Sequence, residues 1–181
     1  MRLKKIIKQL EGKFPLELAE EWDNVGLLLD STRREIKSIM LCLDITRDVV
    51  DKAVANKVDL IISHHPFIFS PLKKITTDEV NGEKILKLAR NNIAVYSMHT
   101  NIDSGIGGLN DFIIKKIGQE GKVFVISDNR CVELRKLVTG DLIDAKDKII
   151  NPLRIQKLKN AITIEELCKI IKEKLCIPNV R

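Results

Sequence analysis

Apolar positions recur along the first two-thirds of the chain with the spacings of helices and buried strands. Leu3, Ile6, Ile7 and Leu10 lie on one face of an amphipathic helix that we expect to end near Gly12 and Pro15. A short helical piece, PLELAEEW, follows it, and WDNVGLLLD is typical of a loop before an apolar run. Three apolar runs, at residues 36–45, 58–62 and 93–98, predict buried strands. Helical patterns follow each run, so the order predicts a parallel sheet with right-handed crossovers.

The pattern changes after Gly121. Residues 123–127 and the stretch VELRKLVTGDLI predict strands with no helix between them. Thr163 and Glu166 form a capping box that opens a helix over 165–175, which Pro178 closes. We therefore predict an α/β fold, with a parallel-strand-containing sheet and flanking helices over residues 1–120. A smaller, incomplete α+β segment is expected over residues 121–181.

Composition restricts the class of protein. A chain of 181 residues, 44% hydrophobic and 31% charged, is typical of one globular domain with a small appendage. No apolar run reaches the roughly 18–20 residues that span a membrane. The charged N-terminal stretch does not resemble a signal peptide. The four cysteines show no C-x-x-C spacing and lie in apolar runs, so we expect buried free thiols in a reducing cytoplasm.

The net charge of +6 is spread along the chain. No block of Lys and Arg interleaved with aromatic residues marks a nucleic-acid groove, so a solvated basic surface is favoured over nucleic-acid binding. The chain has one Trp, one Tyr and five Phe, so the core must be mainly aliphatic and no base-stacking platform is expected.

All three histidines follow predicted strands. His64 and His65 come directly after 58–62, and His99 follows 93–98 with Asp103 four residues later. Ligand sites of parallel sheets lie at the carboxyl ends of the strands, so these side chains and Asp44 are expected on one rim. For Asp44 a structural role, as a helix cap or a loop brace, is favoured over a role in the site.

Imidazole and carboxylate ligands predict a divalent-metal site for Zn, Fe, Mn, Ni or Co. Side chains alternate along extended backbone, so adjacent histidines are expected to serve two ions, or one ion with a supporting contact. The two oxygens of Asp103 suit a bridge between two ions. His99 is a candidate ligand, general base, or group that supports a ligand.

Two other motifs have both a functional and a structural interpretation. The glycines of Gly105–Gly108 open a helix, where they form either a phosphate-binding loop or, as we favour, a tight turn. Trp22 is expected as a core or interface anchor. Asp23 and Asn24 are expected to form an Asx-type turn, unless the tertiary fold brings them to the crevice.

Four strings in the same order resemble the Nif-three-like dinuclear metal-binding family, whose members are labelled homologues of a type-two GTP cyclohydrolase. They are E-E-W-D-N-V-G-L-L from Glu20, D-L-I-I-S-H-H-P-F from Asp59, P-L-K from Pro71 and Y-S-M-H-T-N-I-D from Tyr96. The resemblance implies an α/β fold, toroidal hexamers and two divalent ions. It makes His64, His65 and Asp103 the metal ligands.

From this resemblance we predict a metal-dependent hydrolase that acts on a purine nucleotide, with one or two ions per subunit and His99 as the general base. The alternative is a non-catalytic metal-binding or regulatory scaffold that acts through oligomerisation. Family members complete the site with a His and a Glu from a C-terminal H-x-x-x-E segment, and this sequence has no fourth histidine. We therefore expect a shortened relative or a fragment, one ion bound more tightly than a second, and slow nucleotide turnover.

Overall fold

The chain forms two compact units, Met1–Ile102 and Asp103–Arg181. The computed structural model describes residues 1–33, 35–127, 130–133 and 152–180. The sequence pattern places the division at residue 120, whereas the structure divides the chain after Ile102. The reason is the helix α5 (Leu109–Ile117), which packs against the strand β7 (Arg154–Leu158) and the helix α7 (Ile164–Leu175) of the second unit.

The first unit contains a four-stranded sheet. Its strands are β1 (Gly26–Leu29), β2 (Ile39–Cys42), β3 (Leu60–Ser63) and β4 (Ala94–Ser97), in the order β1-β4-β3-β2. The predicted parallel pairing is confirmed for β2 with β3 and for β3 with β4, whereas β1 adds an antiparallel edge. Cys42 pairs with Ser63, and Ser63 with Ser97, so the three parallel strands end in register at one rim.

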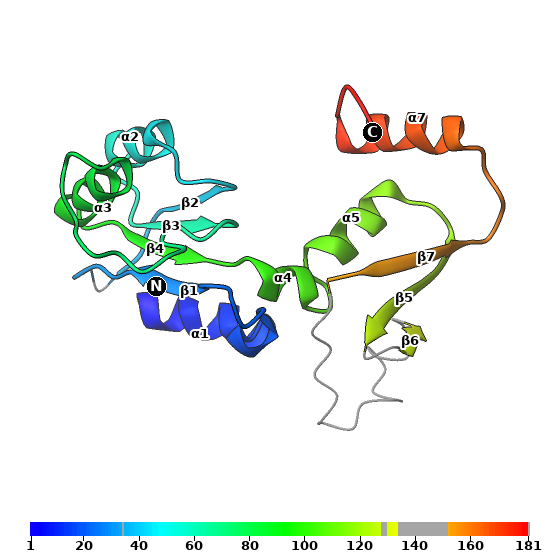
Figure 1. Cartoon of the computed structure of the whole chain (residues 1–181), viewed down its shortest axis with the longest axis horizontal. Coiled ribbons are helices and arrows are strands. Elements are labelled where there is room, and N and C mark those ends of the chain that lie inside the picture. Colours follow the sequence, from blue (N-terminus) through cyan, green and yellow to red (C-terminus); the bar gives the residue numbers. More distant parts are fainter. Residues whose placement is uncertain (34, 128–129, 134–151, 181) are drawn as a thin grey trace. The chain divides into compact units, whose positions relative to one another are not determined.

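Helices cover both faces of this sheet. Figure 1 shows α2 (Arg47–Ala55) and α3 (Val80–Arg90) on one face and α1 (Leu3–Lys13) on the other. The 3₁₀ helix η1 (Leu16–Leu18) follows α1, and α4 (Thr100–Ser104) follows β4. A hydrophobic core lies on each face of the sheet, and successive strand residues pack into the two cores alternately. Leu60 packs with α1, and Ile61 packs with α2 and α3. Burial on both faces explains why β3 and β4 are continuous apolar runs.

Polar signals set the ends of several elements as predicted. The hydroxyl of Thr46 accepts a hydrogen bond from the backbone N–H of Val49 and caps α2, whose Val50 and Ala53 are buried. In the second unit, Thr163 and Glu166 form the expected capping box of α7 (Ile164–Leu175).

The second unit contains a three-stranded antiparallel sheet. Its strands are β5 (Gly121–Ser127), β6 (Arg130–Glu133) and β7 (Arg154–Leu158), in the order β6-β5-β7. Most of the predicted strand stretch VELRKLVTGDLI lies outside the described residues. The pattern analysis missed β7, because its sequence RIQKL has only two apolar residues, Ile155 and Leu158, and they do not alternate with polar ones.

One expectation about thiols is wrong. Cys42, Cys168 and Cys176 are free, but none of the three is buried: Cys42 and Cys168 are partly exposed, and Cys176 is exposed at the end of α7. In the part of the chain that the structure describes, no helix has the length and apolar character needed to cross a membrane.

Candidate metal centre

The three histidines converge at the carboxyl rim of the first unit's sheet. His64 and His65 directly follow β3, and His99 lies two residues beyond β4. Each imidazole offers a nitrogen, and these three atoms lie within 4.8 Å of one another. The ring centroids are 5.0 Å apart for His64 and His65, 5.1 Å for His64 and His99, and 5.5 Å for His65 and His99. Within the described ranges, this is the one close group of three potential metal ligands.

The expectation that adjacent histidines face opposite ways is wrong. β3 ends at Ser63, and His64 and His65 lie in a bend rather than on extended backbone. Their consecutive N–H groups donate to the consecutive carbonyls of Cys42 and Leu43, at 3.1 and 2.9 Å. The hydroxyl of Ser63 also donates to the carbonyl of His65 at 2.9 Å. The bend therefore lets both imidazoles contribute to one cluster.

Asp44 positions the ring of His65. Asp44 follows β2 by two residues, and its Oδ1 lies 2.7 Å from Nδ1 of His65. A carboxylate oxygen accepts hydrogen bonds, so Nδ1 donates and Nε2 is the ring nitrogen left for a metal ion. The loop-bracing role favoured for Asp44 is therefore what the structure shows, and the loop that it braces carries the site.

Asp23 positions His99 in the same way from a buried carboxylate. Its Oδ1 lies 3.0 Å from Nδ1 of His99, and its Oδ2 accepts hydrogen bonds from the backbone N–H and the hydroxyl of Thr100. Burial alone would raise the pKa of Asp23. The hydrogen bonds from Thr100, His99 and the N–H of Asn24 outweigh it and hold the pKa below its ordinary value. Asp23 is therefore an ionised acceptor that fixes the tautomer of His99.

This pattern of contacts is typical of metal-binding histidines. Such histidines donate one ring N–H to a carboxylate and present the other nitrogen to the ion, which fixes the ring orientation and makes the ligand more basic. His65 and His99 both have the carboxylate partner. Three imidazole nitrogens this close together suit a divalent transition-metal ion.

Asp103 and the glycine-rich segment are the other candidates of the sequence analysis. Asp103 is the first residue of the second unit, and its role as a ligand stays a prediction. The glycine-rich segment forms the tight turn that we favoured. Gly108 N–H donates to the carbonyl of Gly105, and Gly107, at φ +73°, donates to Oδ2 of Asp111. That N–H of the proposed phosphate loop is thus already bound to a carboxylate of the protein.

Trp22 is not a core residue, because 60% of it is exposed. Asn24 N–H bonds to Asp23 Oδ1 at 2.8 Å, but this contact joins neighbouring residues, whereas an Asx turn joins the side chain to the N–H two residues on. The sequence analysis left open that the fold brings Asp23 to the crevice, but it did not assign it to His99, which lies 76 residues away. The one signal in the sequence was the combination of the single Trp with two polar residues.

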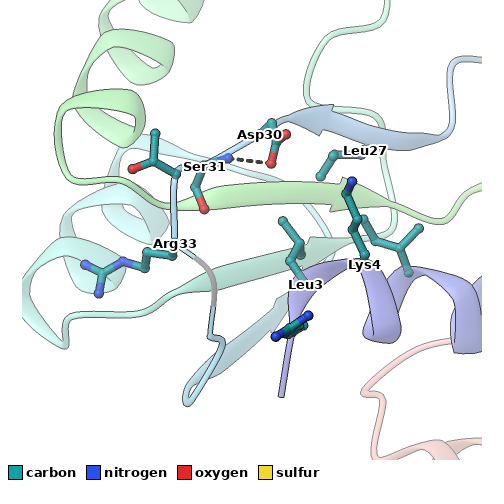
Figure 2. A pocket seen from close by; sticks show the side chains of 9 residues that line it. Leu3, Lys4, Leu27, Asp30, Ser31 and Arg33 are labelled. Atoms are coloured by element: carbon teal, nitrogen blue, oxygen red, sulfur yellow. Dashed lines mark hydrogen bonds between the residues drawn. The ribbon is translucent and has the colours of Figure 1, made fainter.

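A separate pocket of about 430 Å³ lies elsewhere in the first unit. Figure 2 shows that its walls come from the start of α1 and from the segment around the end of β1, and it is lined by Arg2, Leu3, Lys4, Ile7, Leu27, Asp30, Ser31, Thr32 and Arg33. Because β1 runs antiparallel to β4, residues after Leu29 lie at the end of the sheet away from the histidines. The pocket therefore contributes no ligand to the cluster.

Fold and cluster together define an α/β protein with a candidate histidine metal centre at the carboxyl ends of its parallel strands. The whole chain, residues 1–181, matches the family described as Duf34/NIF3 (NGG1p interacting factor 3). The chain belongs to this family.

Relatives with known sequence support this assignment. The chain is 34% identical over 181 residues to a Clostridium acetobutylicum protein named GTP cyclohydrolase 1 type 2 homolog, covering all of this chain and 62% of that protein. It is 42% identical over 117 residues to NIF3-like protein 1 of Drosophila melanogaster, covering 64% of this chain and 40% of the relative. The chain thus spans less than two-thirds of the length of these relatives.

Solved structures share the fold. A Staphylococcus aureus protein matches with a TM-score of 0.73 and 28% identity, over 100% of this chain and 67% of its own. A Bacillus cereus protein related to NIF3 matches with a TM-score of 0.78 and 22% identity, over 100% of this chain and 72% of its own. The predicted α/β fold with parallel strands is therefore confirmed.

Proposed function

We propose that this protein binds a divalent transition-metal ion through His64, His65 and His99 and uses it to hydrolyse a nucleotide. The observation that carries the proposal is the trio of imidazole nitrogens within 4.8 Å of one another. Two of these rings are already oriented by carboxylates on their other nitrogen. We take the substrate class, a nucleotide, from the names of the relatives, which are GTP cyclohydrolase 1 type 2 homologs.

The protein's own residues have distinct tasks in this proposal. The imidazoles hold the ion, and their nitrogen donors suit Zn, Fe, Mn, Ni or Co. Asp23 and Asp44 keep His99 and His65 in the tautomer that presents Nε2. When bound, such an ion supplies Lewis acidity that polarises a substrate oxygen and activates water at neutral pH.

We assign His99 as a ligand rather than as the general base. Its contact with Asp23 repeats the contact of His65 with Asp44, so the two rings are prepared alike. Asp103 is proposed as a further, carboxylate ligand that serves a second ion. Three imidazoles favour one ion, so we expect the first to bind more tightly than the second.

The proposed assembly is a homo-oligomer, a hexamer by family resemblance, in the cytoplasm. β2 is the outer strand of its sheet, and its apolar residues Ile39 and Leu41 are exposed, as is Leu43 beyond it. Exposed apolar side chains on a strand edge are typical of a surface that another chain covers. A monomer by light scattering across a wide concentration range would contradict this assembly.

The test of the function combines metal analysis with turnover. Protein purified without chelator is expected to contain a transition metal and to convert GTP slowly, as followed by chromatography of the products. The His99→Ala variant separates the two roles of that residue, because loss of metal supports a ligand and loss of turnover with full metal supports a general base. Metal without turnover of any nucleotide would instead support the scaffold.

A further inference from the structure

Two exposed aromatic side chains lie beside the histidine cluster, and the proposed metal site does not use them. Trp22 is 60% exposed and Phe69 is 53% exposed. Their ring centroids are 6.1 Å apart with the planes tilted by 56°. The Trp22 ring also lies 6.1 Å from the imidazole of His99, edge on at 76°. Aromatic surface thus continues directly from the proposed metal ligand.

The backbone that carries both rings is fixed by hydrogen bonds. Asp23, next to Trp22, is bonded to His99 and Thr100. The side-chain amide of Asn24 donates to the carbonyl of Ile68 at 2.5 Å, and Ile68 precedes Phe69. The two aromatic segments are therefore tied to each other and to the histidine loop. Backbone held in this way loses little conformational freedom when a ligand binds.

We propose that Trp22 and Phe69 form a stacking subsite for a planar heteroaromatic ring of the substrate, whose polar group faces the histidine cluster. This proposal rests on the proposed function and specifies its substrate class. Large aromatic side chains exposed beside a polar site are typical of ligand-binding surfaces, because their faces stack on any flat ring.

Intrinsic fluorescence can report on this subsite directly, because Trp22 is the only tryptophan of the chain. Zinc-loaded protein is titrated with GMP and, separately, with ribose 5-phosphate, which carries the same sugar phosphate without the ring. We expect saturable quenching by GMP and none by ribose 5-phosphate. Absence of saturable quenching by GMP, or equal quenching by both compounds, would overturn the proposal.

Calorimetric titration of variants tests the two rings separately. Trp22→Ala and Phe69→Ala should each weaken GMP binding on the order of tenfold, as loss of a base-stacking ring does elsewhere. Trp22→Phe should keep most of the affinity, because it keeps an aromatic face. The matched control is Phe112→Ala, since Phe112 is 59% exposed but lies on α5 of the second unit. Equal loss in that control would overturn the assignment.

Two further measurements keep this test separate from that of the metal site. Metal content is measured on the same samples, so wild-type protein without bound metal contradicts the proposed function. Full metal content together with no preference for the ring-bearing compound contradicts the stacking subsite alone. Light scattering compares the oligomeric state of Trp22→Ala with that of the wild type. A shift from oligomer to monomer would identify the two rings as a protein interface and overturn the proposal.

Discussion

Polar side chains at the two ends of the parallel strands in the first unit differ in how fully they are hydrogen-bonded within the protein. Before β3, the buried carboxylate of Asp59 accepts hydrogen bonds from the N–H groups of Lys37 and Ser38 and from the hydroxyl of Ser38. Arg33 adds an ion pair at 3.1 Å. Beyond β3 and β4, His65 and His99 each bond to a carboxylate through Nδ1.

This difference separates a structural use of polar groups from a functional one. Asp59 joins the segment before β2 to the start of β3, and its bonding capacity is used within the protein. Each of the two histidines keeps one nitrogen for a further partner after the other has been fixed. Metal binding requires imidazoles of this kind, with one nitrogen hydrogen-bonded and the ring orientation fixed.

Asp59→Ala should have the largest effect on stability, because it removes the common acceptor of Lys37, Ser38 and Arg33. Leaving those donors without their partner should lower the free energy of unfolding by about 3 kcal/mol, as measured by urea denaturation. Metal content of the folded fraction should not change, because the site lies at the other end of the strands. Loss of metal from folded Asp59→Ala protein would contradict the separation of the two ends.

Asp23→Ala should affect both stability and metal binding. Its carboxylate side chain is fully buried and holds Thr100 as well as His99, so the free energy of unfolding should fall by about 2 kcal/mol. Metal affinity should fall roughly 10- to 100-fold, the usual result of removing a carboxylate behind a metal-binding histidine. Competition with a chromophoric chelator measures that affinity. Unchanged affinity would show that His99 is not a ligand.

Acid should remove the contribution of Asp59. Burial alone would raise its pKa, but the hydrogen bonds from Lys37 and Ser38 and the charge of Arg33 hold the pKa below the ordinary 3.8. A lowered folded-state pKa stabilises the fold above the unfolded-state value, and this stability is lost as the pH falls through the folded-state value. The stability difference between wild type and Asp59→Asn, about 1 kcal/mol at neutral pH, should therefore shrink below pH 3.8. A difference that stays constant into acid would contradict this account of Asp59.

Asp44→Ala should have the smallest effect on the fold. The Asp44 side chain is 56% exposed, so its loss should change the free energy of unfolding by less than about 0.5 kcal/mol. Metal affinity should still fall, by up to about tenfold, because His65 loses the group that orients it. An affinity loss equal to that of Asp23→Ala would show that burial of the carboxylate does not matter for the site.

Sequence periodicity predicted the parallel strands and the rim where the histidines meet, because both depend on local patterns and on a general property of parallel sheets. It did not predict that β1 runs antiparallel, since a four-residue apolar run has no direction. The contact between Asp23 and His99 depends on how a loop returns across the fold. The bend at His64 also departs from the extended geometry that the strand before it suggests.

Metal content per chain tests the central claim most directly. Protein purified without chelator is compared with the His64→Ala, His65→Ala double variant and with Asp59→Asn, a control at the opposite end of the strands. Plasma mass spectrometry should find about one transition-metal ion per wild-type chain, as a three-imidazole site with open positions predicts. The double variant should lose that ion, and the control should retain it. Full metal content in the double variant would contradict the assignment of the histidine cluster as the metal centre.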